Sequence, residues 1–347
     1  MTATETATID AGEAGTQSGV KAGNDQTNFF FTLLLIATLF PILFVPFATP
    51  FRAKATSIDG VFDLLFLLST MHVGLSAFFY SDKMYRSVTV EKWGYYIAFP
   101  LIVIVLLGGI AMTFPTSGII YIVIFYHAWL LFHYGRQNYG ILAFVAAATQ
   151  TGRPLAFEKI ALHLAPIGGI LASYSVLAQA KDSVLSGQLN LLFNLGAILT
   201  FIAIVCAVIG AGMALRSHGN LRRPLTLLIM SCFFVPTFFF SNFTQAIMGY
   251  AIAHAVQYFV FMTFLAAGTK NRPPIMSLFV LLFSMLAVWI IILITREKSI
   301  FGEYQNFVAG AAIGLVIWHF IMDAGFWKLS VPWQREQVRQ RLDFLFK

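Results

Sequence analysis

Apolar residues run along this chain in stretches of about twenty, and short polar segments separate them. Stretches such as LFLLSTMHVGLSAFFY and GAAIGLVIWHFIM are apolar throughout rather than alternating. This pattern predicts membrane-spanning helices and excludes the alternating strands of a porin-type barrel. We therefore expect an all-α, polytopic membrane protein with about ten transmembrane helices in one bundle. The expected helices cover residues 28–49, 58–80, 94–114, 117–142, 158–180, 189–215, 225–241, 243–267, 276–295 and 304–328.

The two ends of the chain differ from this pattern. Residues 1–27 are rich in Thr, Ala, Gly, Glu and Asp and nearly free of large apolar residues, which predicts a disordered tail. This segment lacks the basic start and apolar core of a secretory signal. Residues 28–328 form the expected membrane domain. The last segment, 329–347, predicts a short amphipathic helix at the inner membrane surface.

The composition supports a membrane protein and excludes soluble classes. Hydrophobic residues make up 59% of the 347 positions and charged residues only 11%. A soluble domain carries about 25% charged residues, so this chain cannot cover a water-facing surface of its own size. The net charge of +7 gives no reason to expect a nucleic-acid partner, because in a membrane protein it reports orientation first. Membrane lipids are the expected surroundings.

The distribution of Lys and Arg between the loops predicts the orientation. With ten spans, 15 basic residues fall on the side of the N-terminus and 5 on the other side, while Arg136 and Lys159 fall within helices. The side richer in Lys and Arg is normally cytoplasmic. We therefore expect a multi-pass protein of the cell's inner (cytoplasmic) membrane, with both termini in the cytoplasm.

Histidines inside the predicted spans are the first candidates for chemistry, because a polar side chain in hydrocarbon is costly unless it is paired. Four of them lie on helices that run in the same direction and, at ~1.5 Å rise per residue, within about 8 Å of one depth. They are His72, His133, His254 and His319. Such an all-nitrogen set predicts a metal site suited to iron or copper. The alternative is that each is a hydrogen-bonded core residue.

Other polar residues lie close to these histidines in the sequence. Asp323, at i+4 from His319, is expected either to accept a hydrogen bond from a ligand imidazole or to pair with Arg136. His127 is six residues from His133, so it points to a different face of the same helix. The expected neighbours of the site are Asp323, Gln257, Tyr258, His127, Arg136 and Asn138. No residue is assigned a catalytic role beyond holding the metal.

The histidine contexts MHVGLS, LLFHYGRQN, AHAVQYFVF and WHFIMDAGFW resemble the successive motifs of the Brp/Blh family of membrane β-carotene 15,15′-dioxygenases. That family shows H-G-x-x-D, H-F-G-x-x-D, H-x-x-x-H and a late H-x-x-x-x-D, in the same order. This chain has Ser76, Asn138 and Tyr258 where the first three motifs have Asp, Asp and a second His, and Asp323 is one residue closer to its histidine.

The resemblance implies non-haem Fe²⁺ on helix-borne histidines, dioxygen as co-substrate and a carotenoid cleaved to retinal. We accordingly expect an oxygenase acting on a carotenoid or another long, hydrophobic, lipid-like small molecule. Two alternatives remain open at this point. One is an electron-transfer subunit that binds haem b or is linked to quinone, since transmembrane histidines also ligate haem. The other is a transporter or a non-catalytic partner of a membrane complex.

Overall fold

The computed structural model describes residues 10–48, 69–115, 117–178, 186–240, 243–268, 273–296 and 298–346. Within these ranges the protein is helical and contains no strand, which confirms the predicted all-α bundle. Eight helical segments there are long and apolar enough to cross a membrane. They are Asp25–Phe47, Gly94–Thr113, Ser117–Ala148, Ala156–Val176, Gly187–His218, Gln245–Ala267, Pro274–Thr295 and Gly302–Phe326.

Two of the ten predicted spans differ from this set. Span 58–80 lies outside the described residues up to position 68; its described part is a helical turn, the 3₁₀ helix η2 (His72–Ala77) and α3 (Phe78–Ser81). Span 225–241 is not one continuous helix, as predicted, but α9 (Arg222–Ser231) and α10 (Pro236–Phe239) joined by a turn. Pro236 explains the break, because proline has no amide hydrogen and its ring clashes with the carbonyl four residues earlier.

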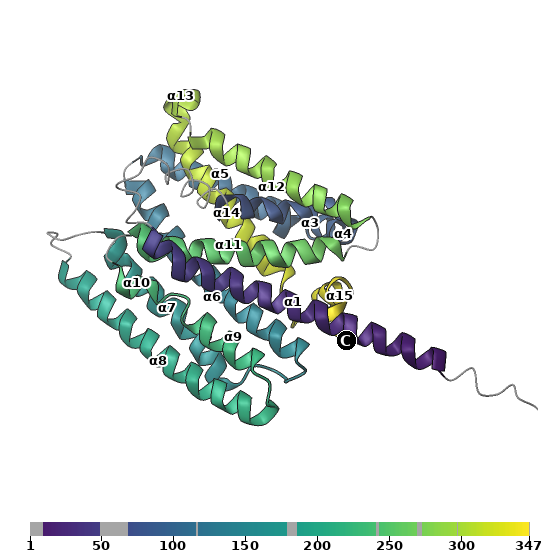
Figure 1. The fold of residues 1–347 in the computed structure, drawn as a ribbon. Coiled ribbons are helices and arrows are strands. Elements are labelled where there is room, and N and C mark those ends of the chain that lie inside the picture. Colours follow the sequence, from purple (N-terminus) through teal and green to yellow (C-terminus); the bar gives the residue numbers. More distant parts are fainter. Residues whose placement is uncertain are drawn as a thin grey trace, which may run out of the picture.

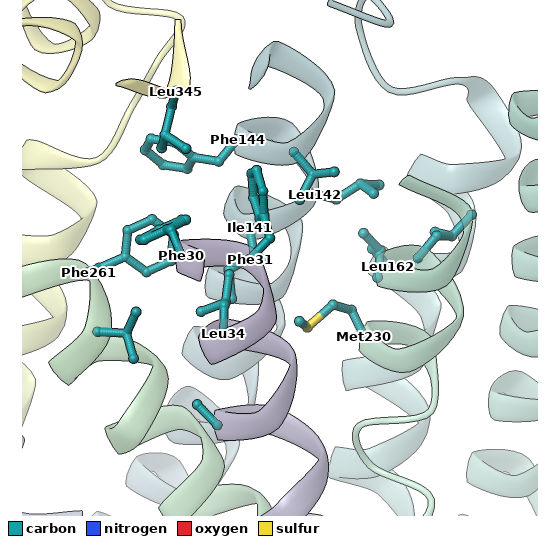
Figure 2. Packing of buried hydrophobic residues seen from close by; sticks show 14 of the residues in the cluster. Phe30, Phe31, Leu34, Ile141, Leu142, Phe144, Leu162, Met230, Phe261 and Leu345 are labelled. Atoms are coloured by element: carbon teal, nitrogen blue, oxygen red, sulfur yellow. The ribbon is translucent and has the colours of Figure 1, made fainter. Parts of the chain in front are cut away.

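Helix α1 (Asp10–Ala48) begins well before the predicted span. Residues 10–27, predicted to be a disordered tail, are helical, and residues 1–9 lie outside the described part. Extending an existing helix requires no new nucleus, which explains how a segment of polar composition continues the spanning helix. The apolar part of α1 packs on α11 (Phe243–Ala267). Figure 2 shows Phe30 and Phe31 of α1 among Phe261, Ile141 and Leu345 in the core.

Helix α11 runs through the middle of the bundle, in contact with α1 and with α12 (Pro274–Arg296) (Figure 1). Two other pairs of helices pack along each other in the bundle. The π-helical turn η3 (Gly94–Ala98) leads into α5 (Phe99–Thr113), which packs along α14 (Gln305–Phe326). Helix α7 (Ala156–Ala178) packs along α8 (Ser186–His218). Helix α6 (Ser117–Ala148) contacts α5, α7, α9 and α14, and therefore connects the two groups.

Two glycines allow close approaches beside the histidines. A Cβ on Gly74 of η2 would lie 2.7 Å from the Cα of Met285 in α12. A Cβ on Gly135 of α6 would lie 2.5 Å from the ring of Pro166 in α7. Because side chains would force these backbones apart, the glycines fix the positions of η2 and α6 in the bundle.

The C-terminal segment docks on the bundle. Arg341, at the end of α15 (Pro332–Arg341), pairs with Asp82 at 2.7 Å, and Asp82 also caps α4 (Lys83–Glu91). Phe344 and Leu345 in η5 (Asp343–Leu345) are buried in the core. The predicted short helix is present as α15, and protein covers these apolar side chains beyond it, while its position at the inner membrane surface stays a prediction. The remaining short elements are α13 (Lys298–Phe301) and η4 (Gly302–Tyr304).

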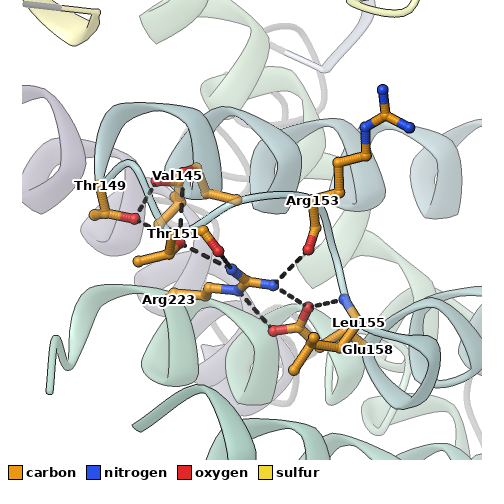
Figure 3. Close-up of polar contacts among 8 residues, drawn as sticks. Val145, Thr149, Thr151, Arg153, Leu155, Glu158 and Arg223 are labelled. Carbon is orange, nitrogen blue, oxygen red and sulfur yellow. Dashed lines mark hydrogen bonds and ion pairs between the residues drawn. The ribbon is translucent and has the colours of Figure 1, made fainter. Parts of the chain in front are cut away.

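A buried ion pair joins α9 to the first turn of α7 (Figure 3). The guanidinium of Arg223 donates to both carboxylate oxygens of Glu158, at 2.8 and 2.6 Å, and to the carbonyls of Thr151 and Arg153. Glu158 in turn accepts a hydrogen bond from the backbone N–H of Leu155. Both charges are thus paired and hydrogen-bonded, which a buried ion pair requires.

Candidate metal centre

Four helical elements bring four imidazoles to one place. His72 opens η2, His133 lies in α6, His254 in α11 and His319 in α14. The ring centroid of His72 is 4.9 Å from that of His254 and 4.8 Å from that of His319. The ring of His133 is 5.0 and 5.3 Å from the same two rings, which are 6.2 Å apart. All four are buried, so the rings expected at a common depth form one contiguous cluster.

The hydrogen bonds of two rings turn their other nitrogens toward the cluster. Nδ1 of His72 contacts the carbonyl of Ser69, which can only accept, so the lone pair of this imidazole is on Nε2. Nδ1 of His319 is 2.7 Å from the hydroxyl of Ser76. A metal-binding imidazole is usually held in this way through its second nitrogen.

Five of the six remaining ring nitrogens are buried without a hydrogen-bond partner in the part of the chain that the structure describes. They are Nε2 of His72, His133 and His319, and both nitrogens of His254. A buried polar atom without a partner is costly, and natural structures contain few of them. Several such atoms aimed at one region fit a bound metal ion, which would satisfy them together.

Asp323 adds a carboxylate to the cluster. Its Oδ2 is 3.5 Å from Nε2 of His133 and 3.7 Å from Nε2 of His319. Two ligands on one metal, with bonds of about 2.0–2.2 Å, are roughly 3 to 4.4 Å apart, so these distances suit shared coordination better than direct hydrogen bonds. Two sets have ligand atoms within 4.8 Å of one another. They are His72, His254 and His319, and His133, His319 and Asp323.

A chain of hydroxyl groups connects this carboxylate back to an imidazole. The hydroxyl of Tyr258 donates to Oδ1 of Asp323 at 2.6 Å and lies 3.2 Å from the hydroxyl of Ser76, which contacts His319. Sequence reasoning placed Tyr258 near the site but assigned no role to Ser76. Its signal was a polar residue at i+4 from His72 inside an apolar stretch. The expected hydrogen bond from the ring of His319 goes to Ser76 rather than to Asp323.

Two polar residues beside the cluster differ in their hydrogen bonding: Gln257 bonds to residues of other helices, and the amide of Asn138 has no partner among the described residues. Gln257 accepts a hydrogen bond from Gln137 at 2.7 Å and donates to Thr38 at 2.8 Å, so it joins α11 to α6 and α1. Gln137 also donates to the backbone carbonyl of His254. Asn138 is buried, and neither atom of its amide has a partner among the described residues.

His127 and Arg136 contact partners outside the imidazole cluster. His127 bonds to the hydroxyl of Ser173 in α7 at 2.7 Å, so one of its ring nitrogens is engaged with that helix. The six-residue spacing from His133 turns it toward that neighbouring helix. Arg136 is exposed, with its guanidinium 3.5 Å from Nε2 of His163, and among the described residues it forms no ion pair with Asp323. The predicted alternative of an ion pair between Asp323 and Arg136 is therefore wrong.

A cavity of about 350 Å³ adjoins the cluster between α6, α11 and α14. His133, Tyr258 and Asp323 form part of its wall, and half of the other lining residues are aromatic. Trp129 and Phe132 are also exposed on the outer surface of the bundle, at 41% and 49% of their areas. The cavity therefore opens at the side of the bundle, where a membrane protein faces lipid.

No model of a known protein family, no curated protein and no solved structure matches this chain. What the chain shows by itself is a membrane-type helical bundle whose buried His and Asp groups can hold a metal ion.

Proposed function

We propose that this protein is a membrane non-haem iron oxygenase acting on a carotenoid or another long apolar lipid. One observation carries the proposal: a buried cluster of four imidazoles and one carboxylate adjoins an aromatic cavity at the side of the bundle, and His133 and Asp323 form part of the cavity wall. A metal held there is reached from the bilayer rather than from water. Its substrate should therefore be dissolved in the membrane.

The donor set favours iron. Imidazole nitrogens with a single carboxylate suit iron, whereas calcium and magnesium prefer oxygen ligands alone. In the proposed site His72, His133, His254, His319 and Asp323 would hold the ion. When bound, iron would supply the activation of dioxygen.

The residues that line the cavity would position the substrate and keep water away from it. Phe132, Phe144 and Phe320 line the cavity and would hold a long substrate with one double bond beside the cluster. Cleavage of a C=C bond by one O₂ yields two carbonyl groups and needs neither an external reductant nor a proton donor. The selectivity would then come from the length and shape of the cavity.

The motif order supports a carotenoid as the first substrate to test. The four histidines occur in contexts resembling the Brp/Blh β-carotene dioxygenases, and the residues at three departures, Ser76, Asn138 and Tyr258, are all buried near the cluster or on its helices. Ser76 and Tyr258 bond to each other and to the site. At two of the positions where it departs from the family motifs, this chain therefore has two hydroxyl groups that contact each other, those of Ser76 and Tyr258.

The haem alternative fits the cluster less well. A porphyrin needs a flat slot between two axial ligands, whereas here the rings of His72 and His133 both lie within 5.3 Å of the ring of His319. A macrocycle on any two of these imidazoles would displace the other two. A strong Soret absorbance band in the purified protein would nevertheless favour this alternative.

Expression in carotenoid-producing cells tests the proposed reaction. We expect loss of pigment colour and the appearance of retinal or apocarotenals, and neither change with His254→Ala. The matched control is His127→Ala, which removes another buried histidine outside the cluster and should retain activity. Unchanged pigment with an iron-loaded protein would exclude carotenoids as the substrate; unchanged pigment with a metal-free protein would exclude the oxygenase.

A further inference from the structure

Two cationic side chains lie in the wall of the largely apolar cavity, besides the polar residues at the metal cluster. They are Arg136 of α6 and Lys328, just after the end of α14. Two cations in a cavity wall can form charge-assisted hydrogen bonds with an anionic group of a bound molecule, which a pure hydrocarbon does not have. Their position is the starting point of an inference that rests on the proposed function and specifies its substrate.

Both cations lie on the same side of the metal cluster. Arg136 follows His133 by three residues, which is ~4.5 Å along the helix axis. Lys328 follows Asp323 by five residues, which is ~7.5 Å along the direction of α14 if the helical rise continues. Helices α6 and α14 run in the same direction, because the ring of His133 packs on Phe320 and the ring of Phe144, further along α6, lies 6.2 Å from that of Trp327, just after α14.

Neither cation is neutralised by a carboxylate in the part of the chain that the structure describes. The ion pairs found there join Glu158 to Arg223, Asp82 to Arg341, and Asp323 to two histidines. Among the described residues, the recorded side-chain contacts of Arg136 are with His163 and Tyr139. Asp323 is the one carboxylate among the residues that line this cavity, and its oxygens face Tyr258 and the imidazoles. Positive charge at this end of the cavity is thus available for an anion.

We propose that the cavity binds a long-chain amphiphile with an anionic end group, which Arg136 and Lys328 hold. Charge-assisted hydrogen bonds from these side chains would fix the anion at one end. The apolar chain would then pass His133 and continue along Trp129 and Phe132 toward the lipid-facing opening. Because the cations are only one to two helical turns from the cluster, the carbon atoms beside it are those close to the anionic end.

Direct binding to the full chain in nanodiscs tests this substrate class without any turnover. The probes are 9,10-dibromostearate, its methyl ester and a lysophosphatidate with the same chain, whose bromines quench tryptophans that they contact. We expect the acid to quench with about tenfold tighter half-saturation than the ester, as one charge-assisted contact implies. Trp129→Phe should reduce the quenching, which places the probe in the cavity.

Variants identify the cations. In the double variant Arg136→Gln, Lys328→Gln, the acid and the ester should bind equally, at the affinity of the ester. The matched control is Arg216→Gln, which removes an exposed arginine that does not line the cavity and should keep the tenfold preference. Tighter binding of the lysophosphatidate than of the acid would identify a phosphate as the natural end group, and the reverse a carboxylate.

The proposal is overturned if the wild-type protein binds the ester as tightly as both anions, or if the double variant keeps the preference. Iron content, measured on the same preparations, reports separately on the proposed function. An anion preference in a metal-free protein would support the binding site while rejecting the oxygenase. Iron-loaded protein without any preference would do the opposite.

Discussion

The imidazole of His319 lies between a hydroxyl and a carboxylate. Ser76 contacts its Nδ1, while Oδ2 of Asp323 lies 3.7 Å from its Nε2. The ring of His72 is likewise held through its Nδ1, by the backbone carbonyl of Ser69. At the scale of single residues the site is thus already oriented: each of these rings directs Nε2 inward before any ion binds.

The hydroxyl of Tyr258 should tune this site. In Tyr258→Phe, Asp323 loses the hydrogen bond at 2.6 Å that orients its carboxylate, and we expect metal affinity to fall about 10- to 100-fold, as for other residues that orient ligands. A competitive titration with a chelator measures this. Tyr250→Phe, which alters another buried tyrosine of α11, serves as the control. Equal affinities for the two variants would show that Tyr258 does not support the metal.

The four histidines could be predicted from the sequence because helical rise alone sets their depth. The direction of each side chain could not, since it depends on the packing of neighbouring helices. Ser76 enters the site through a 3₁₀ turn that the apolar pattern did not indicate. The hydrogen bonds of His127 and Gln257 could not be predicted either, because their partners Ser173 and Thr38 lie on α7 and α1, far away in the sequence.

At the scale of elements, the buried ion pair between Arg223 and Glu158 attaches α9 to the first turn of α7. In Glu158→Gln the guanidinium is left buried without its counter-charge, and we expect a loss of about 3–5 kcal/mol of stability. Thermal unfolding in detergent measures the change. Arg216→Gln, at an exposed position, should leave the unfolding temperature unchanged. A similar unfolding temperature for Glu158→Gln and the wild type would mean that the pair contributes little.

Eight of the predicted spans correspond to long apolar helices because length and hydropathy decide whether a helix can cross a membrane. The exceptions have local causes that such averages miss. Pro236 interrupts the predicted span 225–241. Outside the spans, the Arg341–Asp82 ion pair holds the C-terminal segment against the bundle, which hydropathy does not indicate. Both depend on single residues or on partners distant in the sequence.

At the scale of the whole molecule, both ends of the described chain lie at one end of the bundle. The hydroxyl of Thr27, near the start of the first span, donates to the backbone carbonyl of Phe344 at 2.7 Å. This contact agrees with an even number of membrane crossings. Which side of the membrane they share stays a prediction from the 15 to 5 division of basic residues.

Single cysteines in a variant lacking Cys206 and Cys232 test the orientation. Arg335→Cys lies in the exposed part of α15, and Glu303→Cys lies in η4 at the other end of the chain's last span. In intact cells, a membrane-impermeant maleimide should label the cysteine at 303 and leave the one at 335 unlabelled. Labelling only at 335 would place the termini outside the cell.

Elemental analysis of the purified protein tests the metal centre most directly. The wild type and His127→Ala should each contain about one iron atom per chain. His72→Ala, His133→Ala, His254→Ala and His319→Ala should each lose most of it, because every one removes a ligand from the cluster. A wild-type protein that takes up no iron when it is purified and supplied with Fe²⁺, or four variants that retain it, would contradict the proposed site.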